Sequence, residues 1–211
     1  MTDLIRVAVS LLTMIAMPLL LITVFSSIDT DIGDVIKASK KDIVIIILVA
    51  ILYMIVTRLF NFDTARYVNM SILTGYLVFM SYTDQKTKLL YSIVSIFMIL
   101  FEIIWLVVNI SDIYFTKYDL LLIPVVLAML IMSKFRFLGF GDVLIYVVIV
   151  IYGLIYSLLP FWDILINYFV ANILFVICTS IIRIVTRDKD RNQPFTLYIA
   201  ISTFLCNLFL F

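Results

Sequence analysis

The sequence predicts an all-α membrane protein in which several apolar helices cross a bilayer. Of its 211 residues, 65% are hydrophobic and only 14% are charged, and the mean hydropathy is +1.22. A soluble domain has about half apolar and about a quarter charged residues. The excess is too large for one buried core, since one spanning helix takes roughly 20 apolar residues. The apolar stretches are continuous rather than alternating, which favours helices over the strands of a membrane barrel.

Eight apolar runs, each near spanning length, define the expected helices. In chain order they are Leu4–Phe25, Ile43–Phe60, Tyr67–Tyr82, Leu89–Ile110, Leu120–Met132, Val143–Leu159, Ile164–Ile184 and Phe195–Phe211. The fifth is short, and we expect it to be tilted or extended at its ends. Pro18 and Pro124 lie inside runs, where a missing backbone donor is expected to kink the helix. The first run lacks a small-residue cleavage site followed by a soluble domain, so we interpret it as a retained span.

The distribution of lysine and arginine predicts the orientation of these helices, because cytoplasmic loops are rich in basic residues. The segments on one side, which carry 11 of the 15 basic residues, are Asp29–Asp42, Thr83–Lys88, Lys134–Gly141 and Arg183–Gln193. We therefore expect a multi-pass protein of the plasma membrane with an even number of spans and both termini outside.

The composition also excludes several kinds of function. The chain has no histidine, which removes Ser-His and Cys-His catalysis and the usual zinc sites, and we expect neither a metal nor a cofactor. Cys178 and Cys206 lie far apart in apolar runs and are interpreted as small buried hydrophobic residues. The net charge of +1 argues against a nucleic-acid partner.

Two aspartates are the candidate catalytic residues. Asp142 follows Gly139-Phe140-Gly141 and opens the sixth run, and Asp84 ends the third run. An ionised carboxylate inside a bilayer costs at least a few kcal/mol, so acids at such positions are functional candidates. The two intervening runs return the chain to the same side, which gives Asp84 and Asp142 the same side and similar depth.

Structural interpretations of the acidic residues remain open. By its position alone, Asp142 fits a helix N-cap at the membrane interface about as well as it fits a catalytic residue. The paired glycines favour function, since they leave room for another backbone to approach. Asp84 alone fits a solvated interfacial residue. Glu102, in the fourth run, is interpreted as a structural hydrogen-bonding group rather than a proton pathway, and Asp163, in a short outer turn, as a cap.

Two carboxylates that meet would form a hydrolytic pair. They cannot both ionise cheaply, so they share one proton and their pKa values separate. The ionised member then takes a proton from water, and the protonated member donates to the peptide carbonyl that the water attacks.

Three stretches resemble the type IV prepilin peptidase family, among the GxGD intramembrane aspartic proteases. Gly139-Phe140-Gly141-Asp142 is similar to the GxGD motif of the family. Asp84-Gln85-Lys86-Thr87-Lys88 resembles the first aspartate, which ends a helix and precedes a short basic stretch. Gln193-Pro194-Phe195-Thr196-Leu197-Tyr198-Ile199-Ala200, after a basic loop, resembles the Pro-Phe segment that begins the last helix.

The resemblance covers roughly Tyr67 to the C-terminus, and it implies both an architecture and an activity. Residues 67–211 would form a six-helix peptidase core, preceded in residues 1–66 by two helices with a short cytoplasmic loop. Asp84 and Asp142 would be the catalytic pair. The motif residues expected to bind substrate or shape the site are Gly139, Gly141, Pro194 and Phe195. The substrate would be a prepilin or pilin-like precursor, cut at the cytoplasmic membrane face where its basic leader meets its apolar helix.

The sequence departs from the family in two places. Leu89-Leu90-Tyr91 stands where the family often has Ile-Pro-Asn. The N-terminal loop lacks the cysteine-rich domain that large members use for methylation, so we expect the peptidase-only form. A non-enzymatic membrane protein, such as a proton-coupled transporter or a scaffold of a secretion machine, is the alternative, with Glu102 and Asp142 as proton-carrying groups.

Overall fold

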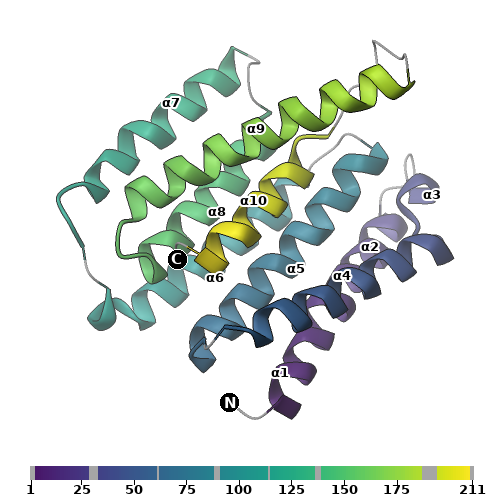
Figure 1. Ribbon diagram of the computed structural model, residues 1–211, viewed down its shortest axis with the longest axis horizontal. Helices are drawn as coiled ribbons and strands as arrows, with labels where there is room; N and C mark the ends of the chain where they lie inside the picture. Colours follow the sequence, from purple (N-terminus) through teal and green to yellow (C-terminus); the bar gives the residue numbers. More distant parts are fainter. Residues whose placement is uncertain are drawn as a thin grey trace. The chain divides into compact units, whose positions relative to one another are not determined.

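Every regular element in the computed structural model is helical across the part of the chain that the structure describes (Figure 1). That part consists of residues 3–28, 33–60, 62–87, 91–113, 115–135, 139–186 and 194–209. The all-α prediction is confirmed, and each of the eight predicted runs contains a helix. Contacts between the helices divide the chain into two compact units, Met1–Lys88 and Leu89–Phe211.

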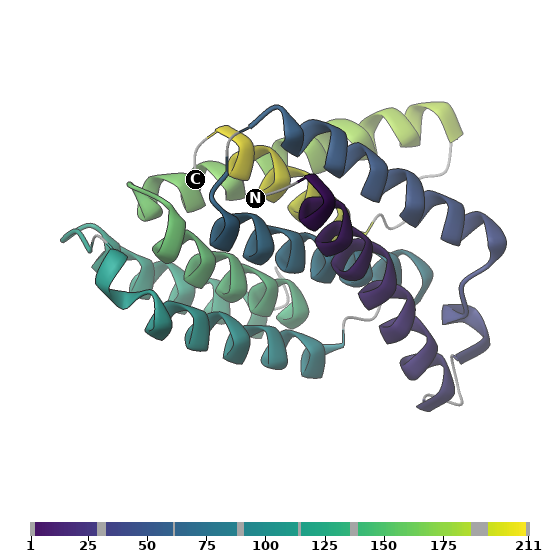
Figure 2. The ribbon, with the colours of Figure 1, turned by 90° about the horizontal axis from the view of Figure 1, so that it is seen from below.

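The first unit begins with one long, locally widened helix. Its elements are α1 (Asp3–Ser10), the π-helix η1 (Leu11–Ala16), α2 (Met17–Ile28), α3 (Gly33–Ile36), α4 (Lys40–Arg58) and α5 (Thr64–Thr87). Figure 2 shows α1, η1 and α2 following one another without a break. Pro18 is the second residue of α2, and its ring crowds the preceding turn. The distortion expected at Pro18 is therefore observed as the wider π-helical turns of η1, which directly precede α2.

Helix α5 packs against α1, η1, α2 and α3 and forms the centre of the first unit. A Cβ added at Gly75 would lie 2.1 Å from the carbonyl oxygen of Thr13, so only glycine allows this approach of α5 to η1. Buried hydroxyl pairs reinforce the packing, among them Ser10 with Tyr67 at 2.7 Å. The sequence assigned this helix to the core that begins at residue 67, whereas its contacts join it to the N-terminal helices.

In the second unit, α8 packs against three other helices. The elements are α6 (Ser92–Val108), the 3₁₀ turns η2 (Ile110–Asp112) and η3 (Asp119–Leu121), α7 (Leu122–Lys134), α8 (Phe140–Tyr156), α9 (Pro160–Thr186) and α10 (Thr196–Phe209). Helix α8 contacts α6, α7 and α9, and α10 lies along α9 (Figure 1). Because α8 packs against these three helices, the backbone that carries the side chains at its start is fixed in place.

Proline marks the beginnings of two helices in the second unit. Pro160 is the first residue of α9, where its missing N–H costs nothing. Pro124 is the third residue of α7, which follows directly on η3. The prediction that Pro124 kinks a helix inside the fifth run is therefore wrong. A residue in the first turn of a helix has no intrahelical partner for its N–H group, so the N–H that proline lacks is not missed there.

Two of the described helices are long and apolar enough to cross a membrane, judged by length and composition. They span Leu4–Ile28 and Pro160–Ile182, with mean hydropathies of 2.5 and 2.1. Three further apolar helices, α6, α8 and α10, are shorter, and α7 has 13 residues. The expectation that every run approaches spanning length is thus met in only part of the described chain.

The outer faces of the helices are nevertheless apolar, while polar groups lie inside. On α4, Ile45, Leu48, Leu52 and Ile55 share one face and are between 57% and 60% exposed. Asn69 and Asn167, in contrast, are completely buried. Water favours the opposite arrangement, in which large contiguous apolar patches are covered.

Candidate functional site

Asp142 lies in the first turn of α8, three residues after the capping residue Gly139. A Cβ added at Gly139 would lie 2.8 Å from Oδ2 of Asp142, so the carboxylate folds back over this glycine. The cap position belongs to Gly139, and the interpretation of Asp142 as the N-cap is wrong. The free N–H groups at a helix start favour a negative charge, so this position suits an ionised carboxylate.

The start of α10 contacts the same carboxylate. The hydroxyl of Thr196 donates a hydrogen bond of 3.3 Å to Oδ1 of Asp142, and Thr196 is completely buried. Thr196 directly follows the half-buried Pro194 and Phe195, and Gly141 is the second residue of α8. The structure therefore joins two of the three predicted motif stretches, which are 54 residues apart in the chain.

Asp84 is buried in the last turn of α5, with 8% of its surface exposed. The end of a helix presents free carbonyl groups and disfavours negative charge. Asp84 therefore occupies the opposite kind of helix end from Asp142. The two residues belong to different compact units, and their meeting stays a prediction.

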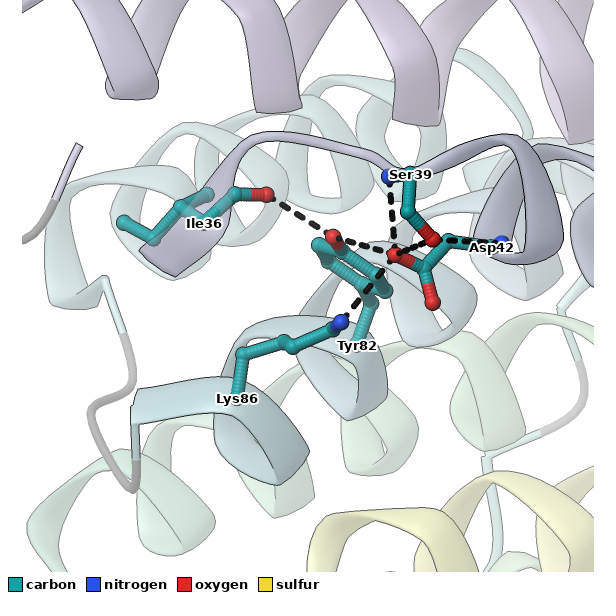
Figure 3. Close-up of polar contacts among 5 residues, drawn as sticks. All are labelled: Ile36, Ser39, Asp42, Tyr82 and Lys86. Atoms are coloured by element: carbon teal, nitrogen blue, oxygen red, sulfur yellow. Dashed lines mark hydrogen bonds and ion pairs between the residues drawn. The ribbon is translucent and has the colours of Figure 1, made fainter. Parts of the chain in front are cut away.

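A cluster of polar side chains joins the start of α4 to the last turns of α5 (Figure 3). We call it the α4 clasp, and it consists of Ser39, Asp42, Tyr82 and Lys86. Ser39 and Asp42 form a reciprocal capping box, and Lys86 forms an ion pair of 3.0 Å with Asp42. Tyr82 donates to the carbonyl oxygen of Ile36 at 2.8 Å and to Asp42 at 3.3 Å. This clasp fixes the α3–α4 segment on the part of α5 that carries Asp84.

The ionised form of Asp42 is stabilised by these contacts. Burial alone would raise the pKa of this carboxyl, but the hydrogen bonds from Ser39 and the nearby Lys86 outweigh it and lower the pKa. Asp42 is therefore a structural anion, occupied by its own helix and by Lys86.

Tyr146 lies one turn after Asp142 on α8, on the same helix face. It is completely buried, and its ring contacts Tyr168 of α9 edge-on at 5.5 Å. Within the described chain its hydroxyl has no hydrogen-bond partner. The sequence analysis missed both Tyr146 and Thr196. Thr196 could have been noticed in the sequence because it is a polar residue directly after Pro194 and Phe195.

The remaining residues that the sequence singled out are buried or half-buried. Asp163 is buried and accepts a hydrogen bond from Ser157, which closes the turn between α8 and α9. Glu102 is completely buried in α6. Both cysteines are free thiols, and Cys206 is buried as expected whereas Cys178 is half-buried.

Several predicted features lie outside the described residues. These are Lys88 with Leu89 and Leu90, Arg136 with Leu138, and residues 187–193 of the basic loop before Pro194. Within the described part, no three acidic or cysteine side chains gather closely enough to hold a metal ion.

No family model, curated protein or solved structure matches the chain. The assignment of function therefore depends on the chemistry of the residues and on the contacts just described.

Proposed function

We propose that the protein is an intramembrane aspartic endopeptidase that removes the basic leader from prepilins or pilin-like precursors. The observation that carries this proposal is the contact between Thr196 and Asp142. It brings the start of the Pro-Phe helix to the carboxylate of the GxGD-like stretch. A helix cap has no need of such a partner, whereas a catalytic carboxylate must be held in one orientation.

The distribution of apolar surface supports a location in the plasma membrane. Exposed apolar faces and a polar interior are stable when the surroundings are lipid. We propose that all eight helices cross the bilayer, with both aspartates near the cytoplasmic face. Helix α7, with 13 residues, is about 20 Å long. It is therefore shorter than the roughly 30 Å hydrocarbon core and would require local thinning of the bilayer.

The proposed chemistry is the addition of water to a peptide bond. One ionised carboxylate removes a proton from water as the oxygen bonds to the carbonyl carbon, and the protonated carboxyl donates its proton to the carbonyl oxygen. The tetrahedral diol then collapses: the second carboxylate takes back a hydroxyl proton as the C=O bond re-forms, the C–N bond breaks, and the leaving amine takes a proton from the carboxyl that the water had protonated. No metal and no nucleophilic side chain takes part.

The helix ends suggest which aspartate has which role. The start of α8 and the hydroxyl of Thr196 favour negative charge on Asp142. Asp142 is therefore the proposed base, and Asp84 is the proposed acid.

The direct test is cleavage in purified proteoliposomes. The substrate is a synthetic precursor with a short lysine- and arginine-rich leader, a glycine at the junction and an apolar helix. We expect the wild type to release the leader, detected by mass spectrometry, and Asp84→Asn and Asp142→Asn to release none.

The matched control is Asp34→Asn, which makes the same chemical change at an exposed acid in α3 and should leave cleavage intact. Substantial cleavage by either Asp84→Asn or Asp142→Asn contradicts the dyad. Equal loss in Asp34→Asn would show that the assay reports on expression rather than on catalysis.

A buried acid also favours a second candidate, a proton-coupled transporter. Glu102 is completely buried in α6, and acids within membrane helices commonly carry protons. Proton flux into liposomes that Glu102→Gln abolishes, without any cleavage of precursor by the wild type, would favour this candidate over the peptidase.

A further inference from the structure

We propose that Thr196 is a positioning residue for Asp142, and this inference rests on the proposed peptidase function. Its hydroxyl donates to Oδ1 of Asp142, while Oδ2 lies over Gly139. The two oxygens therefore have different surroundings: Oδ1 accepts a hydrogen bond from Thr196, and Oδ2 lies beside the backbone of Gly139. Thr196 thereby fixes the orientation of the carboxylate.

The contact can hold a fixed geometry because the start of α10 is packed from the side. The ring of Phe175 on α9 meets Phe195 edge-on at 5.3 Å and Tyr198 at 5.5 Å. These two rings flank Thr196 in the chain and leave its backbone little freedom. Thr196 is itself β-branched and buried, so its hydroxyl has few available directions.

A second set of contacts fixes α10 along α9. The side-chain amide of Asn167 donates to Thr203 at 3.0 Å and accepts from Ser202 at 3.1 Å. All three side chains are buried. A hydrogen-bonded amide inside a helix pair sets the axial register of that pair, so the height of Thr196 relative to Asp142 is determined by α9.

The hydrogen bond also favours the charged form of Asp142. A donor to a carboxylate stabilises the ionised state, and it adds here to the effect of the helix start. The side chain one turn away, Tyr146, is a phenol and stays neutral near pH 7. Loss of the Thr196 hydroxyl should therefore weaken both the orientation and the ionisation of the proposed base.

Three variants separate positioning from packing. Thr196→Val keeps the shape and removes the hydroxyl, and Thr196→Ser keeps the hydroxyl. Thr57→Val removes a buried hydroxyl that donates to the carbonyl oxygen of Tyr53 within its own helix, α4. We expect Thr196→Val to lower kcat at least about tenfold with KM unchanged, as for loss of an interaction that aligns the base. Thr196→Ser and Thr57→Val should stay within about twofold of the wild type.

A second measurement does not depend on cleavage. Hydrophobic carbodiimides react with protonated carboxyl groups, and labelling of Asp142 can be followed by mass spectrometry at pH 7. We expect faster labelling in Thr196→Val than in the wild type, Thr196→Ser and Thr57→Val. Equal labelling in Thr196→Val, with kcat unchanged, overturns the positioning role. A wild type that cleaves no precursor but shows the expected order of labelling supports the role of Thr196 and overturns the peptidase.

Discussion

The starts of α4 and α8 both place an aspartate in the first turn of a helix, yet the two carboxylates have different surroundings. At the start of α4, Asp42 is bound by the side chain of Ser39 and by Lys86 (Figure 3). At the start of α8, the capping residue is Gly139, which has no side chain, and Thr196 donates to one carboxylate oxygen.

The difference distinguishes a structural acid from a candidate catalytic acid at equivalent positions. A structural acid is paired with a cation and completes its own helix cap. A catalytic acid must be held in one orientation, and Thr196 on another helix supplies such a contact for Asp142. The comparison predicts that changes at the α4 clasp alter stability, whereas changes around Asp142 alter activity.

The largest expected effect is that of Asp142→Asn. The substitution removes the proposed base but keeps its size and its position at the helix start, so cleavage should fall at least about a thousandfold. The melting temperature should change little. Leader release measured beside thermal unfolding tests both statements, and a cleaving Asp142→Asn protein would remove the distinction between the two helix starts.

A smaller loss of activity is expected for Gly139→Ala. The new Cβ would lie 2.8 Å from Oδ2 of Asp142, so the carboxylate must move. Misplacement of a catalytic group by about 1 Å costs on the order of a hundredfold in rate, and we expect kcat to fall by about ten- to a hundredfold.

The matched change at the other helix is Ser39→Ala. It removes the cap of α4 and should cost about 1 kcal/mol of stability with cleavage unchanged. Steady-state kinetics and melting temperatures of the two variants form one experiment. The comparison fails if Gly139→Ala is destabilised and fully active.

Asp42→Asn should lower stability without abolishing cleavage. The variant loses the ion pair with Lys86, whose side chain is 35% exposed, and the charge at the start of α4. After allowance for solvent screening, we expect a loss of about 1 kcal/mol at neutral pH.

The effect of Asp42 should also depend on pH. Because its folded pKa is lowered, its contribution is complete above the ordinary carboxyl pKa of about 4 and disappears as the pH falls through the lowered value. Melting temperatures of the wild type and Asp42→Asn should therefore differ at pH 7 and converge in acid. A difference that grows in acid would show the opposite shift.

The smallest expected effect is that of Lys86→Gln. The bonds that Ser39 donates to the carboxylate of Asp42 remain, so we expect a loss of about 0.5 kcal/mol or less. The loss should shrink further as salt is added, since the pair is partly exposed. A large, salt-independent destabilisation would mean that Lys86 acts through packing.

The sequence predicted well those features that depend only on residues close together in the chain. Each of the eight apolar runs contains a helix, and the Gly-Phe-Gly-Asp stretch located the start of α8, whereas the short helix α3 lies outside the runs. Helix ends were harder to predict. Helix α5 continues past its apolar run to Thr87, so Asp84 lies inside the helix. The hydroxyls of Thr83 and Thr87 donate to carbonyl oxygens of the preceding turn.

Features that depend on contacts between helices could not be read from the sequence. The assignment of α5 to the first unit follows from its close approach to η1 at Gly75, which needs a partner 62 residues away in the chain. The bond between Thr196 and Asp142 likewise joins distant segments. The Ser39-Lys40-Lys41-Asp42 pattern, in contrast, is a local capping box that the sequence does contain.

The π-helical segment Leu11–Ala16 makes the N-terminal rod intolerant of deletions. A π-bulge accommodates about one extra residue, and each residue turns a helix by about 100°. The wider turns already absorb the rotation of that residue, so its removal would restore a narrower regular helix and leave the faces of α1 and α2 nearly unchanged. The carbonyl oxygen of Thr13 would then withdraw from Gly75 on α5, so a one-residue deletion should be more damaging than any substitution on the outer side of the same helix.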